Sequence, residues 1–101
     1  DGKTLVKLTA TVKGGMVKTY QPNGKELVAL NALVDGNGAV TTYQPNGKLL
    51  VALNSTDNGV LVWVYNKTGE TIAQTGADEY GNGVVGAYNR KGKGRTLQPG
   101  L

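Results

Sequence analysis

The chain repeats itself at a short interval, and this repetition limits the folds open to it more than any other feature. Residues 19–31 read TYQPNGKELVALN and residues 42–54 read TYQPNGKLLVALN, so the two segments differ only where Glu26 corresponds to Leu49. Extending the comparison gives four units and a truncated fifth, at 2–23, 24–46, 47–68, 69–91 and 92–101. This periodicity predicts one repeat domain, 1–101, in which a single supersecondary motif is tiled.

Each unit has room for two short strands and shows no helical periodicity. Its pattern is G-K-x-L-V-x-L-x-A, then a loop rich in Gly, Asn and Asp, then V-x-x-Y-x-x-x. Apolar and polar residues alternate in both runs, which is typical of half-buried strands. We therefore expect an all-β fold: an antiparallel meander of about eight short strands, with a ninth at Thr96–Leu97 if the truncated unit pairs.

Turn signals between the runs set the expected strand pairing. Asn23-Gly24 and Asn46-Gly47 favour two-residue type I′ hairpin loops. Such loops would pair Val17 with Leu30, Lys18 with Ala29, Thr19 with Val28, Tyr20 with Leu27, Tyr43 with Leu50, Tyr65 with Ile72 and Tyr88 with Arg95. The remaining turns, at 13–15, 35–38, 57–59 and 80–83, predict loops of about three to five residues, each with a bulge at the glycine that keeps the register.

Alternation along the strands separates an apolar face from a mostly polar one. The predicted core or oligomer interface consists of Val6, Leu8, Val17, Val28, Leu30, Val40, Val51, Leu53, Val62, Val64 and Val85. A sheet with one bare apolar face needs a cover, because each exposed Val or Leu forgoes roughly 1.5–3 kcal/mol of burial. No helix is predicted that could supply this cover.

The cover must then come from the sheet itself or from copies of it. Small apolar side chains and units of equal length favour three chains arranged as a trimeric β-prism, each meander forming one wall. A closed up-and-down barrel and a monomeric β-solenoid are the alternatives. The expected partner is therefore the chain itself, in a homo-oligomer.

The tandem units also carry a resemblance to known proteins. With G-K-x-L-V-x-L and V-x-x-Y-x-x-x-G recurring over residues 2–91, the chain resembles the β-hairpin repeats of bacterial surface and phage-tail-like fibre proteins, including trimeric β-prism stalks. This resemblance implies a structural module of a fibre, stalk or surface assembly. It also favours an extracellular, cell-surface or virion location.

Composition argues against catalysis. The chain has no Cys and no His, which excludes disulfides, zinc fingers, a Cys nucleophile and imidazole acid–base chemistry. Residues 81–86 spell G-x-G-x-x-G, but no predicted helix follows to hold a pyrophosphate. Adjacent Asp78 and Glu79 would point to opposite faces of a strand rather than converge on a substrate. We expect no enzyme activity, no cofactor and no metal.

A second hypothesis assigns carbohydrate or polyanion binding to the chain. Its candidate residues are Trp63, Tyr43, Tyr65, Arg90, Lys91, Lys93 and Arg95. An exposed Trp can stack on a sugar ring, but we favour the interpretation that Trp63 fills the space over Gly86 and Thr41, because aromatic side chains dominate ordinary packing. Charges in residues 1–89 sum to zero, so the basic segment 90–95 supplies the whole net charge of +4.

Two further classes of partner are disfavoured. Aromatic residues are not interleaved with the basic ones, which argues against nucleic acid. Apolar runs are far shorter than the ~20 residues that span a bilayer, so no membrane partner is expected.

Overall fold

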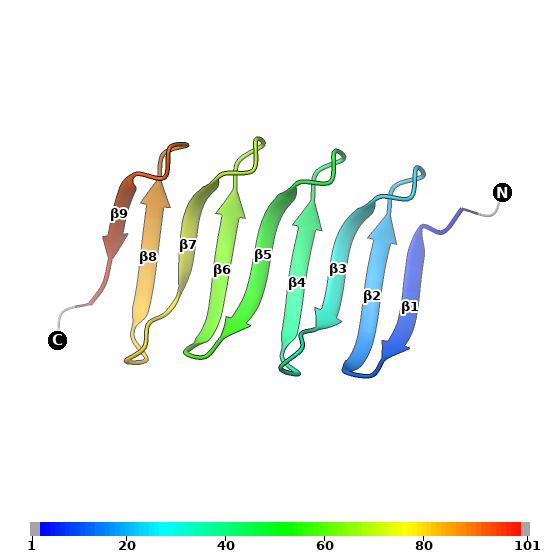
Figure 1. Ribbon diagram of the computed structural model, residues 1–101, viewed down its shortest axis with the longest axis horizontal. Helices are drawn as coiled ribbons and strands as arrows, with labels where there is room; N and C mark the ends of the chain where they lie inside the picture. Colours follow the sequence, from blue (N-terminus) through cyan, green and yellow to red (C-terminus); the bar gives the residue numbers. More distant parts are fainter. Residues whose placement is uncertain (1–2, 100–101) are drawn as a thin grey trace.

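The structure is a single antiparallel sheet in which the strands follow one another in chain order (Figure 1). It is a computed structural model and describes residues 3–99. The strands are β1 (Val6–Thr11), β2 (Gly14–Tyr20), β3 (Glu26–Ala32), β4 (Gly38–Tyr43), β5 (Leu49–Thr56), β6 (Gly59–Tyr65), β7 (Thr71–Ala77), β8 (Gly83–Tyr88) and β9 (Gly94–Leu97). The all-β antiparallel meander and its ninth strand are confirmed.

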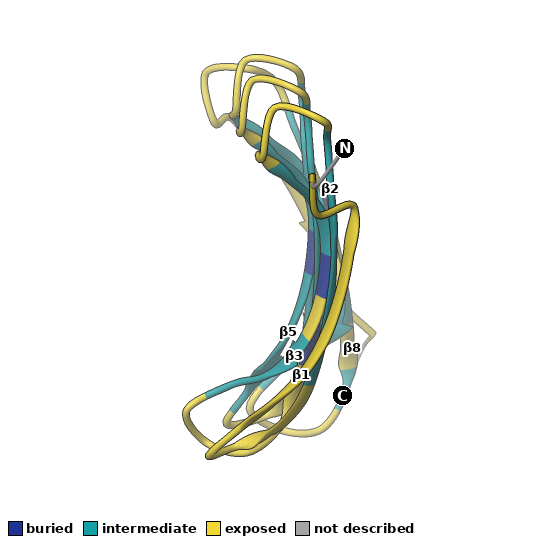
Figure 2. Cartoon of the chain, turned by 90° about the vertical axis from the view of Figure 1, so that its right-hand side faces the viewer, coloured by how far each residue is buried: buried dark blue, intermediate teal, exposed yellow. Residues whose placement is uncertain are grey.

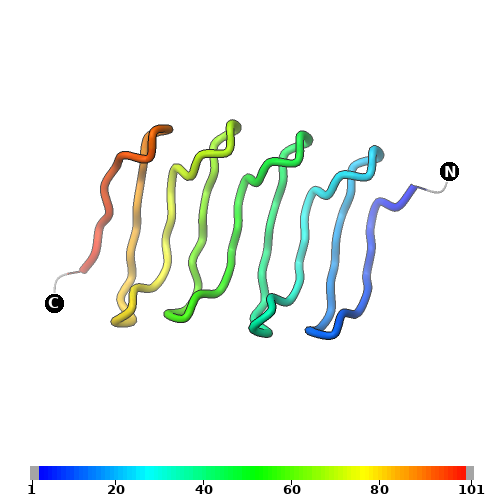
Figure 3. The backbone as a smooth tube through the Cα atoms, viewed as in Figure 1, coloured from blue at the N-terminus to red at the C-terminus, as the bar shows by residue number. Residues whose placement is uncertain are grey.

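No helix lies between residues 3 and 99, and hence none of a length and hydropathy suited to crossing a membrane. Figure 3 follows the chain as it runs back and forth between two rows of turns. Strands β1 and β9 form the two edges of the sheet and do not pair with each other. The sheet is therefore open, and the expected alternative of a closed barrel is wrong for the single chain.

The QPNG turn between β2 and β3 differs from the expected two-residue type I′ loop. Gln21 N donates a hydrogen bond to Lys25 O at 2.8 Å, and Gly24 N donates to Gln21 O at 2.9 Å. The loop therefore has three residues, 22–24. Gly24 has a φ of 91° whereas Asn23 has no positive φ, which rules out type I′, since that turn needs positive φ at both central residues. The turn after β4 repeats this geometry.

An odd loop length shifts the strand pairing by one residue near this end of the sheet. Val17–Leu30, Lys18–Ala29 and Thr19–Val28 pair as expected. A bulge between Thr19 and Tyr20 then changes the register, and similar bulges lie before Tyr43 and Tyr65. The four tyrosine pairings expected from the sequence are wrong, because the partners are Glu26 for Tyr20, Leu49 for Tyr43, Thr71 for Tyr65 and Gly94 for Tyr88.

The opposite row of turns keeps its register without bulges. Thr11 pairs with Gly14 and Thr56 with Gly59, so these two loops have only two residues. The 34–36 and 79–81 loops have three residues, since Leu33 N donates to Asn37 O and Asp78 N to Asn82 O, both at 2.7 Å. The bulges expected at these glycines are thus absent from the described strands and lie instead at the QPNG end.

Neighbouring units are also joined through their turns. Gln21 Nε2 donates a hydrogen bond to the Pro45 carbonyl at 3.0 Å, and Gln44 Nε2 donates to the Lys67 carbonyl at 2.9 Å. In the other row, the Asp35 carboxylate accepts bonds from Asn37 N and Ser55 Oγ, both at 3.0 Å. Hydrogen bonds from the Asn37 backbone and from the Asn37 and Ser55 side chains lower the pKa of Asp35.

The chain forms one curved layer with almost no interior (Figure 2). Its extents are 57 × 31 × 14 Å, and its radius of gyration of 16.0 Å exceeds the ~13 Å of a compact domain of this length. The exposed area is 6917 Å², against about 5,400 Å² for a compact monomer of the same mass. Among the described hydrophobic residues only Ala29, Ala39 and Ala52 are buried.

Candidate functional site

The most extensive feature of the surface is an apolar row that crosses all nine strands. Paired residues of an antiparallel sheet share a face, so the registers assemble this row directly. We call it the central row, and it consists of Leu8, Val17, Leu30, Val40, Leu53, Val62, Thr75, Val85 and Leu97. Thr75 is its single polar member.

Two further rows flank the central row on the same face. The row nearer the QPNG turns contains Val6, Thr19, Val28, Thr42, Val51, Val64, Ala73, Ala87 and Arg95. The row nearer the other turns contains Ala10, Gly15, Ala32, Gly38, Ser55, Val60, Ala77 and Gly83. All eleven residues predicted as core or interface therefore lie on this one face, which we call the apolar face.

The single chain leaves the apolar face open to solvent. Leu8 is 74% exposed, Val85 53% and Leu30 43%, and none of the eleven predicted residues is buried. The three buried alanines all lie on the opposite face. The step from bulky to small side chains forms a shallow hollow of about 700 Å³ over β1–β5, between the central row and the row of Ala and Gly. The surface is thus uncovered, apolar and contoured.

The opposite face is mixed in character. Its middle row consists of Lys7, Lys18, Ala29, Thr41, Ala52, Trp63, Gln74, Gly86 and Thr96. Lys18 Nζ forms an ion pair with Glu26 Oε1 at 2.6 Å, and this bond raises the pKa of Lys18. Both side chains are partly exposed, so the pair adds little to stability.

Trp63 lies at a small hollow on this opposite face. The hollow, of about 260 Å³, is lined by Trp63, Thr71, Gln74, Tyr88 and Gly92. The ring of Tyr88 occupies the space where a side chain on Gly86 would stand. Tyr88, and not Trp63, therefore fills the space over Gly86, which corrects the Gly86 part of the expectation that Trp63 fills the space over Gly86 and Thr41. Tyr88 has room to fold back because residue 86 has no side chain.

The other candidate ligand-binding residues do not converge on this hollow. Tyr43 and Tyr65 are not among the residues that line it. Arg90 and Lys91 lie in the loop closed by the hydrogen bond from Asn89 N to Lys93 O, at 2.7 Å. Arg95 pairs with Ala87 and so belongs to the apolar face. Sequence reasoning missed Thr71, Gln74 and Tyr88; pairing Trp63 across to Gln74 would have found one of them.

Within residues 3–99 no three His, Cys, Asp or Glu side chains lie close enough together to hold a metal ion. A scan against protein-family models finds no matching family, and a search of the curated proteins finds no match.

Proposed function

We propose that the chain is a non-catalytic structural repeat module of a fibre, stalk or surface assembly, and that it associates with copies of itself through the apolar face. The observation that carries this proposal is the uncovered central row, which runs without a break in its hydrogen-bonded register from β1 to β9. Contiguous exposed apolar surface of this kind marks an interaction site.

The size of the face suits a stable interface. A stable protein complex buries roughly 800 Å² on each partner. The sheet extends over 57 × 31 Å, so either face provides more area than that. Val and Leu side chains on the central row would lose their remaining exposure when a copy covers them, at roughly 25 cal/mol per Å². Self-association would therefore supply the hydrophobic core that one layer lacks.

Three copies fit this face better than a larger ring. The central row is one residue wide, and its flanking rows consist of Ala, Gly, Ser, Thr and Val apart from Arg95 at the β9 edge. Three walls can meet along such a row with no cavity between them, whereas more walls would open a central channel lined by apolar groups. A trimeric β-prism with the long axis of the sheet along the fibre is the arrangement that we favour.

The test is the mass of the chain in solution. Sedimentation equilibrium over a hundredfold concentration range should give a species of about three times 10.5 kDa. A compact species of 10.5 kDa at every concentration would contradict the proposal. A species of twice the chain mass would support self-association and would contradict the trimeric prism.

Carbohydrate binding is a second candidate function, favoured by the hollow at Trp63. Trp63 and Tyr88 offer rings for stacking and Gln74 offers an amide for hydrogen bonding, all lining one hollow. Binding to a glycan array should be lost on Trp63→Ala and kept on Tyr20→Ala, which removes an aromatic ring outside this hollow. The absence of binding to any glycan would eliminate this candidate.

A further inference from the structure

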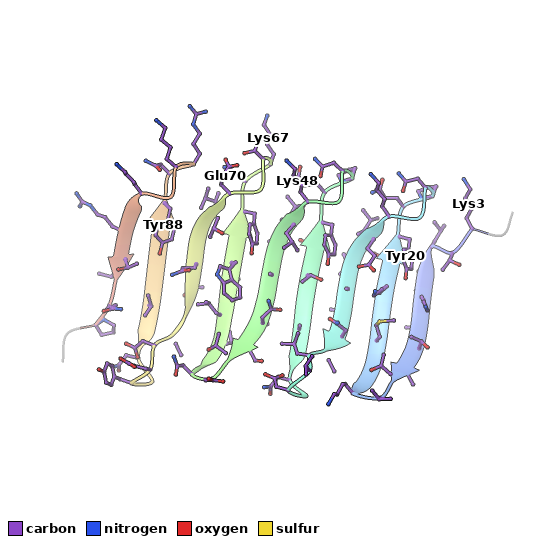
Figure 4. The ribbon with its side chains drawn as sticks, viewed as in Figure 1. Lys3, Tyr20, Lys48, Lys67, Glu70 and Tyr88 are labelled. Atoms are coloured by element: carbon purple, nitrogen blue, oxygen red, sulfur yellow. The ribbon has the colours of Figure 1, made fainter. Side chains whose placement is uncertain are left out.

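Charges of opposite sign lie on the two opposite rows of turns. Because the strands alternate in direction, the turns after β2, β4, β6 and β8 lie along one border of the sheet, where Figure 4 labels Lys3, Lys48, Lys67 and Glu70. This basic border carries seven cations and one carboxylate: Lys3, Lys25, Lys48, Lys67, Arg90, Lys91, Lys93 and Glu70.

The other row of turns has the opposite charge. The turns after β1, β3, β5 and β7 carry four carboxylates and one ammonium group: Asp35, Asp57, Asp78, Glu79 and Lys13. We call this row the acidic border. The two borders are separated by the length of the strands, along the 31 Å dimension of the sheet.

These charges are not matched within one chain. The ion pair found among residues 3–99 joins Lys18 to Glu26 and involves none of the acidic-border carboxylates. Glu70 is the one carboxylate of the basic border, and hydrogen bonds from Thr68 and Asn66, with Lys48 and Arg90 nearby, lower its pKa. Each border therefore presents a charge excess, positive on one and negative on the other, to whatever lies beside it.

We propose that the basic border of one copy lies against the acidic border of the next copy, so that the copies run parallel around the fibre axis. The inference rests on the self-association proposed above and adds its geometry. A head-to-tail contact of this type uses two different surfaces of the chain and closes into a ring when the rotation permits. In a three-walled prism every corner would then join a basic border to an acidic one.

The order of the strands places acidic and basic turns at alternating heights along the axis. Asp57 lies between β5 and β6, and Glu79 between β7 and β8, whereas Lys67 lies between β6 and β7. Two walls at the same height would therefore interleave acidic and basic turns at one-strand intervals, ~4.8 Å. A two-fold axis along the strands would instead bring like borders together, which repulsion disfavours.

A second copy is a better occupant than an extended polyanion. A polyanion would account for the basic border alone and would leave the acidic border without a role. Complementarity between two borders of the same chain, at the same spacing, accounts for both. It also agrees with an apolar face that needs copies of the chain to cover it.

The test reverses charges whose side chains have no structural task in the turns. Asp57 and Glu79 make no side-chain hydrogen bond to another described residue, in contrast to Asp78, whose Oδ1 accepts bonds from Tyr80 N and Asn82 N at 2.9 Å. The acidic-border variant is therefore Asp57→Lys/Glu79→Lys. The compensated variant adds Lys67→Glu/Lys91→Glu, which places a carboxylate in a neighbouring turn across the contact from each introduced lysine and returns the net charge of the chain to +4. Lys7→Glu, in the middle of β1, is the control for a charge reversal that lies outside both borders.

We expect the dissociation constant of the assembly, measured by sedimentation at low salt, to rise at least about tenfold in the acidic-border variant. The compensated variant should recover to within about threefold of the parent chain, and Lys7→Glu should change little. In 1 M salt, where the Debye length is ~3 Å, the difference between the acidic-border variant and the parent should shrink.

The outcomes separate this inference from the proposed function. A parent chain that stays monomeric refutes self-association itself. If the parent chain assembles and the acidic-border variant assembles equally well, the border contact is refuted and the apolar-face contact stands. A compensated variant that fails to recover also refutes border pairing. If dextran sulfate binds the parent and the acidic-border variant equally while both stay assembled, the basic border serves a polyanion and the inference is overturned.

Discussion

Replacing Leu30 by aspartate tests the apolar face most directly. Leu30 lies in the central row, paired with Val17 on one side and Val40 on the other. It is 43% exposed in the single chain, so a carboxylate there would still reach water. The sheet of one chain should tolerate the change, whereas an assembly that covers the row should not.

The expected magnitude follows from that exposure. Full burial of Leu contributes about 1.5–3 kcal/mol, and the 43% still open to a partner corresponds to roughly 0.6–1.3 kcal/mol per copy. Desolvating an unpaired carboxylate costs several kcal/mol more. Three copies would bring three such groups to one axis, a total on the order of 10 kcal/mol. The association constant should then fall by about six powers of ten or more.

The assay is sedimentation equilibrium beside a matched control. Asn31→Asp adds the same charge one residue further along β3, where it lies on the opposite face, paired with Ala39. Leu30→Asp should give a folded monomer at concentrations where Asn31→Asp keeps the parent mass. If Leu30→Asp keeps the parent oligomeric mass, the assignment of the apolar face as the interface is refuted.

Three smaller perturbations test the turns by thermal denaturation. Gly47→Ala should lower the free energy of unfolding by about 1–2 kcal/mol, because Gly47 has a φ of 90°. Gly38→Ala is the control, since Gly38 has no positive φ and a Cβ at either glycine would meet no atom within 4 Å. Equal melting temperatures for the two variants would contradict this prediction. Gln44→Leu should cost about 0.5–1.5 kcal/mol through loss of the bond to the Lys67 carbonyl, and an unchanged melting temperature would argue against that link. The pKa of Asp35 is lower in the folded chain than its usual value of 3.8, so the unfolded chain binds a proton at Asp35 more readily. The ionised Asp35 carboxylate therefore stabilises the fold above pH 3.8, and this contribution is lost as the pH falls through the lower folded pKa. Asp35→Asn should reduce the loss of stability between pH 6 and pH 2, and an identical loss in the variant and the parent would refute the assignment.

Repetition and alternation were enough to predict the meander, while the position of the bulges was not. The sequence Gln21-Pro22-Asn23-Gly24 contains two competing turn signals. Asn-Gly favours a type I′ loop, whereas Pro at the second position of the turn and Gly at the fourth favour a type I turn. The structure has the hydrogen bond from Gly24 N to Gln21 O and the negative φ at Asn23 that a type I turn requires. Proline fixes φ near −65° at residue 22, so giving it more weight would have moved the partner of Tyr20 from Leu27 to Glu26.

The candidate ligand site was predicted only in part, because its members come together through packing. Register alone places Trp63 beside Gln74, and Gln74 beside Gly86. The backward fold of Tyr88 over Gly86 depends on the space that a missing side chain leaves, which no count along a strand reveals. Residues two apart on a strand share a face, so a glycine two positions before an aromatic residue is a signal that could have been used.

The distribution of charge on the folded sheet differs from its distribution along the sequence, because the chain is a repeat. Summed along the chain, residues 1–89 are neutral and only the segment 90–95 is basic. Summed by turn, the same residues separate into a basic border and an acidic border, because alternate turns of a meander lie on opposite sides of the sheet. Opposite charges that sum to zero along residues 1–89 therefore lie at opposite ends of the strands. Association of copies with opposite borders together would cancel them in space, in the same contact that covers the apolar face.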